Sequence, residues 1–148
     1  MTEAEWEDVF AVDLKSASLC AKVILPQMLA AKSDAVVNIA LVHADHTFPG
    51  YFPYAAAKSW LVGLALEVGP QQVRVNAPGW TEAKLVAEYF AIQPPEMRQQ
   101  VLDVHPMVRI AKPSEIANCV VLLLSDEASF VTGANWRVDG DLGARFAG

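Results

Sequence analysis

Residues 35–58 read AVVNIALVHADHTFPGYFPYAAAK, a stretch in which a strand pattern gives way to a loop and then to a helix pattern. AVVNIAL, residues 35–41, is almost continuously apolar, which is typical of a parallel strand that is buried on both faces. The loop after it contains two prolines and a glycine, and the helix pattern then runs from about Tyr54 to Val68. Strand, loop and helix in this order predict an α/β fold.

A long helix is expected in front of this strand, over residues 4–30. Thr2 and Glu5 have the spacing of an N-cap and its capping-box partner. The apolar stripe of this helix begins at Trp6, Phe10, Leu14 and Leu19 and runs toward Met28. The chain therefore opens with a helix, a strand and a second helix.

Two further strand patterns follow. VRVNA, residues 73–77, ends at a Pro-Gly pair, and NWRVDG, residues 135–140, ends at an Asp-Gly pair. The region between them has the pattern of helices, with breaks expected at Pro94–Pro95 and near Pro106. A further helix is expected to begin at Pro113. Strands that are separated by helices pair in parallel through right-handed crossovers. The sequence predicts a three-stranded α/β layer with parallel strands near 35–41, 73–77 and 135–140.

The composition limits the classes of partner. The 148 residues carry a formal charge of -6 and have an isoelectric point near 4.9, so Coulomb repulsion opposes binding to nucleic acid or to an anionic membrane. No apolar run reaches the roughly 18 residues of a membrane span, and the acidic first residues are unlike a signal peptide. Cys20 and Cys119 lie among apolar residues and are expected to be buried free thiols, which suit a reducing cytoplasm. No metal site is predicted.

Tyr54 and Lys58 are the first candidates for chemistry. Because they are four residues apart on a helix, their side chains are expected on one face, one turn apart. A nearby ammonium favours the phenolate and lowers the tyrosine pKa from about 10, which makes proton donation to a developing alkoxide easier. The same spacing also occurs where a packed tyrosine merely neighbours a solvated lysine. The surrounding sequence has to decide between these explanations.

Five landmarks occur in order along the chain. They are VVNIA (36–40) on a strand, YAAAK (54–58) at a helix start, VRVNAPG (73–79) on a strand, KPSEIA (112–117) at a helix start, and SDEASFVTGANWRVDG (125–140). Together they resemble the short-chain dehydrogenase/reductase family, and the resemblance also covers the helix EAEWEDVFAVDL (3–14). It implies a truncated Rossmann-type fold of three layers. It also implies an NAD- or NADP-dependent oxidoreductase that transfers a hydride to or from a small carbonyl compound.

The resemblance also implies roles for particular residues. Tyr54 is the expected general acid, and Lys58 is expected to assist it while holding the nicotinamide ribose. The Pro-Gly turn is expected to lie against the nicotinamide ring, which the two residues after it approach. The implied cofactor-binding residues are Tyr54, Lys58, Pro78, Gly79, Trp80 and Thr81.

The family's glycine-rich phosphate turn has no counterpart in these 148 residues, which contain no glycine cluster. We therefore expect residues 1–148 to form a single truncated domain that lacks the N-terminal dinucleotide-binding half. Weak binding of NADH and NADPH is the expected consequence.

Three positions depart from the family pattern. Leu41 occupies the place of the catalytic serine and cannot hydrogen-bond a substrate oxygen. Asp13 stands where the family has an asparagine that holds a proton-relay water, and Ala83 stands where a threonine closes the Pro-Gly turn on the nicotinamide amide. We expect Leu41 to fill the core and Asp13 to be an ordinary solvated or capping acid. His43 and His46 are the loop side chains that could replace the serine.

These departures leave three functions open. The chain is an oxidoreductase of the family that is impaired or inactive on its own, or a non-catalytic oligomerisation or interaction module derived from one, or a truncation product without a function. A homo-oligomer is expected through the helices at 4–30 and 54–68, because the family commonly uses these helices for dimerisation and their apolar faces suit that use.

Overall fold

The first half of the molecule is organised by one long helix. The computed structural model describes residues 1–32, 35–40, 47, 50–68, 81 and 83–145. Helix α1 (Glu3–Phe10), a π-helical turn η1 (Ala11–Lys15) and helix α2 (Ser16–Ala31) follow one another without a break. At its start the Thr2 hydroxyl accepts a hydrogen bond from the Glu5 amide, and the Glu5 carboxylate accepts one from the Thr2 amide. The predicted capping box is confirmed.

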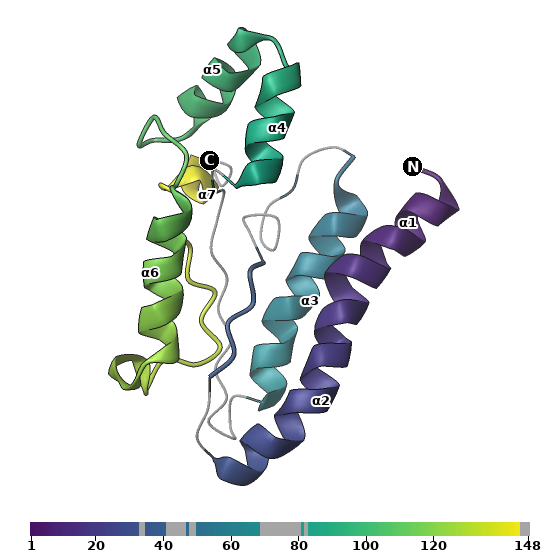
Figure 1. Cartoon of the computed structure of the whole chain (residues 1–148), viewed down its shortest axis with the longest axis vertical. Coiled ribbons are helices and arrows are strands. Elements are labelled where there is room, and N and C mark those ends of the chain that lie inside the picture. The colour runs from purple at the N-terminus through teal and green to yellow at the C-terminus, as the bar shows by residue number, and fades with distance from the viewer. Residues whose placement is uncertain (33–34, 41–46, 48–49, 69–80, 82, 146–148) are drawn as a thin grey trace.

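Helix α3 (Phe52–Val68) packs along this long helix and contacts α1 and η1 (Figure 1). It begins two residues before the predicted start, because a proline such as Pro53 is tolerated in the first turn of a helix. Its side chains Ala57 and Leu61 are buried, and Leu61 forms a small core with Ala40. This packing fixes the position of α3 and of the side chains that it carries.

The face of α2 that packs inward differs from the predicted stripe. Ala17 packs against the core of Ala40 and Leu61, whereas Leu19 is 53% exposed. The 3.6-residue period places Leu19 well off the face that Phe10 and Leu14 begin. The expected burial of Cys20 is wrong for the same reason, since Cys20 is exposed.

The second half of the described chain is mainly helical. Its elements are α4 (Lys84–Ile92), α5 (Pro95–Val104), α6 (Pro113–Leu124), the short 3-10 turn η4 (Asp126–Ala128) and α7 (Leu142–Arg145). The predicted breaks are confirmed, because the helix ends before Pro94–Pro95 and again before Pro106, and the next helix opens at Pro113. None of the helices described is long and apolar enough to cross a membrane.

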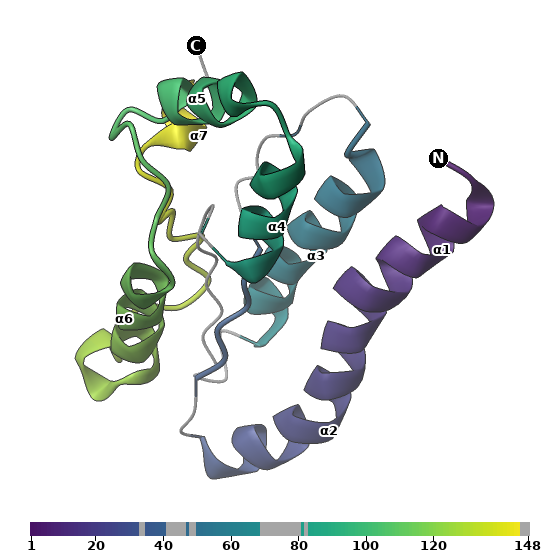
Figure 2. The same cartoon turned by 45° about the horizontal axis from the view of Figure 1, so that its top comes forward.

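The elements lie in layers. Helices α1, α2 and α3 lie on one side, α6 lies on the other, and the extended segments 35–40 and 134–138 run between them (Figures 1 and 2). Helices α4, α5 and α7 gather at one end. Helix, extended chain and helix is the layer order of an α/β fold.

The extended segments differ from the predicted strands in one respect. Over the described residues the structure assigns no strand to 35–40 or 134–138, and it contains an isolated parallel bridge between Thr81 and Ala111. A strand is defined by hydrogen bonds to a neighbour. The expected neighbour, the predicted strand 73–77, lies outside the described residues.

Candidate functional site

Tyr54 and Lys58 project from the first turns of α3 and lie together. The Lys58 Nζ atom lies over the Tyr54 ring, 5.2 Å from its centroid, within the range of a cation–π contact. Both side chains are partly buried against the long helix. The arrangement puts a proton-donating phenol beside a fixed positive charge.

Asp13 completes this group from a different element. Its Oδ1 atom lies 2.9 Å from Lys58 Nζ, and the side chains are only 22% and 13% exposed, respectively. Asp13 belongs to the π-helical turn η1, which contacts α3. The expectation that Asp13 is an ordinary solvated or capping acid is wrong, because tertiary packing brings its carboxylate to a lysine on another helix.

The pKa of Tyr54 moves opposite to the expected direction. Burial, which disfavours the charged phenolate, raises the pKa of Tyr54 to about 12, and the negative charge of Asp13 acts in the same sense. The expectation of a lowered pKa considered Lys58 alone. The ion pair with Asp13 offsets the positive charge of Lys58, so the phenol stays protonated at neutral pH.

Some of the other candidate residues lie within the described part of the chain, and others do not. Leu41, His43, His46, Pro78, Gly79 and Trp80 lie outside the described residues. Thr81 forms the parallel bridge with Ala111, the residue before the N-cap of α6. Ala83 is the N-cap residue of α4 and makes no side-chain capping bond.

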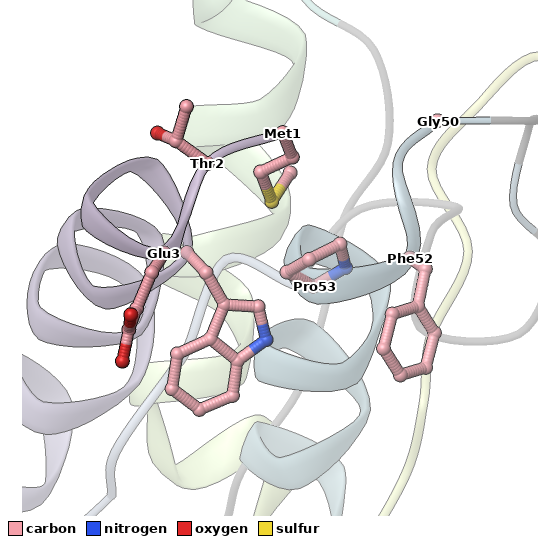
Figure 3. A pocket seen from close by; sticks show the side chains of 7 residues that line it. Met1, Thr2, Glu3, Gly50, Phe52 and Pro53 are labelled. Carbon is pink, nitrogen blue, oxygen red and sulfur yellow. The ribbon is translucent and has the colours of Figure 1, made fainter.

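An apolar pocket lies where α1 and α3 begin, and sequence reasoning did not anticipate it. Its volume is about 440 Å³. Met1 points toward Pro53 across this space, and Phe52 lies on its far side (Figure 3). The lining residues are Met1, Thr2, Glu3, Trp6, Gly50, Phe52 and Pro53. The pocket adjoins the turn that leads into Tyr54.

A second, charged cavity of about 360 Å³ lies at the start of α6. Arg109 donates two hydrogen bonds of 2.7 Å to the Glu115 carboxylate, which also accepts one from the Lys112 amide. The Asp139 carboxylate accepts from the amides of Asp141 and Gly143. These bonds engage the carboxylates of Glu115 and Asp139 in local structure. Among the described residues no three His, Cys, Asp or Glu side chains are placed to hold a metal ion.

Comparison with known proteins identifies relatives. A family model described as Enoyl-(Acyl carrier protein) reductase matches residues 1–142. The 3-oxoacyl-[acyl-carrier-protein] reductase FabG of Thermotoga maritima is 32% identical over 96% of this chain, and that of Staphylococcus aureus strain Mu50 is 33% identical over the same share. The chain spans 58% of the length of both relatives.

Solved structures agree with the sequence relatives. The 3-oxoacyl-[acyl-carrier protein] reductase from Brucella melitensis superposes with a TM-score of 0.83 at 33% identity, and covers 95% of this chain and 53% of its own. Levodione reductase superposes with a TM-score of 0.88 at 31% identity, over 97% of this chain and 59% of its own. The fold is therefore α/β and Rossmann-like.

Proposed function

Because the chain belongs to the short-chain dehydrogenase/reductase family, we propose that Tyr54 and Lys58 form the proton-donating half of an NAD- or NADP-dependent oxidoreductase site acting on a small carbonyl compound. The observation that carries this proposal is the placement of the Lys58 ammonium over the Tyr54 ring on one face of α3. A phenol beside a fixed ammonium can donate a proton to a carbonyl oxygen that gains negative charge during reduction.

The side chains present suit the nicotinamide ribose of such a cofactor. Tyr54 and Lys58 offer two donors on one helix face, and a ribose offers two neighbouring hydroxyl groups to bind them. These two residues would hold the ribose, and the bound dinucleotide supplies or accepts the hydride. Trp80 and Thr81, which follow the Pro-Gly turn, are proposed to line the nicotinamide end of the site.

The role of Tyr54 follows from its protonation state. With a pKa of about 12 it is a phenol at neutral pH, so it can donate its proton to a carbonyl oxygen during reduction. The phenolate that remains is stabilised by the Lys58 ammonium beside it. The reverse reaction, alcohol oxidation, needs the phenolate at the start.

We also propose that this activity is impaired. Leu41 replaces the expected serine, so the carbonyl oxygen has one donor where two are expected. Loss of such a donor typically costs about a hundredfold or more in rate. Leu41→Ser should therefore increase carbonyl reduction, and Tyr54→Phe should abolish it in both backgrounds.

The experiment that tests the proposal is a titration of the purified chain with NADH and NADPH, followed by assays of carbonyl reduction. We expect weak binding and slow reduction that depends on Tyr54. Tyr89→Phe is the matched control, since Tyr89 is a phenol on the exposed surface of α4. Equal rates for the Tyr54→Phe and Tyr89→Phe variants would contradict the proposal.

A non-catalytic role as a self-associating module is the second candidate, and the exposed apolar side chains of the first helices favour it. The long helix and α3 expose Trp6, Val12, Leu19, Val23, Ile24 and Trp60. We propose that a second copy of the chain covers this surface, through residues 4–30 and 54–68. Light scattering at micromolar concentration should show an oligomer that Val23→Glu dissociates and that Val121→Glu on α6 leaves intact. A monomeric parent chain would refute this role.

A further inference from the structure

The π-helical turn η1 carries Asp13 on the surface of the long helix that meets α3. Its defining bond runs from the Ser16 amide to the carbonyl of Ala11, five residues earlier. The Ser16 hydroxyl donates a short hydrogen bond to the Val12 carbonyl, which helps to satisfy the widened turn. Turns of this kind are uncommon and occur frequently at functional sites. Here the turn lies directly against the start of α3.

The contact that Asp13 makes is direct. At 2.9 Å, Lys58 Nζ and Asp13 Oδ1 are within hydrogen-bonding distance, and no water molecule fits between them. Both side chains are mostly removed from solvent. A pair of charges in such surroundings interacts more strongly than an exposed pair, and either charge is destabilised when its partner is removed.

From this geometry we propose that Asp13 is a positioning residue, whose carboxylate holds the Lys58 ammonium in a direct ion pair and draws it away from the nicotinamide ribose. The inference about the ribose rests on the proposed function. The ion pair itself does not depend on any bound molecule. The ion pair of Lys58 and Asp13, together with the neutral phenol of Tyr54, thus forms one group of interacting side chains that spans α3 and η1.

Asp13 also sets the charge that Tyr54 experiences. Apart from burial, Asp13 is the group that raises the pKa of Tyr54, and the Lys58 ammonium lies over the ring. The other charged side chains of α1 and η1 are exposed, namely Glu3, Glu5, Glu7, Asp8 and Lys15. Removing the Asp13 charge should therefore lower the Tyr54 pKa, while burial keeps it above 10.

Tyrosinate absorbance of the unliganded chain tests this inference. We expect Asp13→Asn to lower the pH of the Tyr54 transition below the parent value of about 12. Asp8→Asn is the matched control, because Asp8 carries the same charge on the exposed side of α1, and its contact with the Ala11 amide uses the backbone carbonyl. The control should leave the transition in place. A transition that Asp13→Asn does not move would overturn the inference.

Lys58→Gln removes the positive charge of the ion pair instead of the negative one. This variant tests the inference if Asp13→Asn unfolds the chain. Removing the ammonium leaves the Asp13 charge unbalanced, so the pH at which Tyr54 ionises should rise above that of the parent chain. A fall in that transition would contradict the inference. The ¹⁵N resonance of the Lys58 side chain should also lose its ion-pair signature in Asp13→Asn.

Dinucleotide titrations separate this inference from the proposed function. If Asp13 withdraws Lys58 from the ribose, Asp13→Asn should bind NADH or NADPH with a lower Kd than the parent chain. A shifted tyrosine transition with no dinucleotide binding by either protein would contradict the proposed function and leave the ion-pair control of Tyr54 standing. An unshifted transition contradicts the inference whatever the dinucleotide result.

Discussion

The Nζ atom of Lys58 lies 2.9 Å from the Oδ1 atom of Asp13, across the contact between α3 and the π-helical turn η1. The two residues belong to different helices and are brought together by tertiary packing. Their pairing offsets the positive charge beside Tyr54, whose pKa is about 12. The properties of the tyrosine therefore depend on a residue far away in the sequence.

Tyr54 should ionise at about pH 12 in the folded chain, and Tyr54→Phe should remove that transition from the tyrosinate absorbance. The folded pKa is raised above its usual value of 10.0, so the associated stability is fully present below pH 10 and is lost as the pH rises through about 12. Chemical denaturation across this range should show the parent chain losing more stability than Tyr54→Phe. Ionisation of Tyr54 near its ordinary pKa of 10.0 in the folded chain would contradict the assignment.

Val108→Gly should stabilise the chain by about 1 kcal/mol, because a β-branched residue at positive φ is strained and glycine is not. Val108 has φ 52° and is 60% exposed, so the substitution loses little burial. The measurement is the free energy of unfolding in urea. Val121→Gly, on the exposed face of α6, is the control and should destabilise by about half a kcal/mol, since glycine weakens a helix interior. The same sign for both substitutions would argue against strain at Val108.

Glu115→Gln should make the free energy of unfolding depend less on pH in the acid range. Hydrogen bonds from Arg109 hold the pKa of Glu115 at about 2, below its ordinary value of 4.5, and the Lys112 amide contributes. A lowered carboxyl pKa gives stability that is present above pH 4.5 and is lost as the pH falls through about 2. Unfolding curves between these pH values should be flatter for Glu115→Gln than for the parent, while Glu96→Gln on α5 should match the parent. Parallel curves for all three proteins would exclude the Arg109–Glu115 pair as the cause.

Ala83→Ser should stabilise helix α4 by roughly 0.5–1 kcal/mol, because a serine hydroxyl can accept a hydrogen bond from an amide of the first helical turn. Ala83 occupies the N-cap position with extended backbone angles and is exposed, so a serine fits there. Thermal unfolding should show the increase. Ala87→Ser, inside the same helix and also exposed, should be neutral or destabilising. A loss of stability in Ala83→Ser would show that the serine hydroxyl does not cap helix α4.

The local signals in the sequence predicted the helices well. The Thr2–Glu5 capping box, the break at Pro94–Pro95 and the start at Pro113 all depend on contacts within a few residues, which spacing alone can reveal. The strand patterns at 35–41 and 135–140 carried less information about pairing. Ladder formation depends on a neighbouring strand that is distant in the sequence, and the structure describes residues 35–40 and 134–138 as extended chain without an assigned ladder.

The candidate site was predicted in part. The four-residue spacing indicated that Tyr54 and Lys58 share a helix face, and the structure places the ammonium over the ring. The family resemblance places Asp13 near the proton relay, where its charge is expected to disfavour the Tyr54 phenolate, but AVDLK signals neither a π-helical turn nor a direct ion pair with Lys58. The expected lowering of the Tyr54 pKa was wrong, because it left out the burial of the phenol, which only tertiary packing produces.

The π-helical turn also determines how the molecule responds to the loss of a residue at this place. The five residues of η1 cover about the same rotation as four residues of α-helix, because a π-helical turn holds more residues per turn. Deleting one residue from 11–15 should therefore leave a continuous α-helix whose two ends keep their relative orientation. Trp6 and Phe10, which stack on each other at 4.3 Å, would stay on the same side of the helix. Such a deletion should preserve the packing of α1 against α3 and act mainly on the position of Asp13 within the turn.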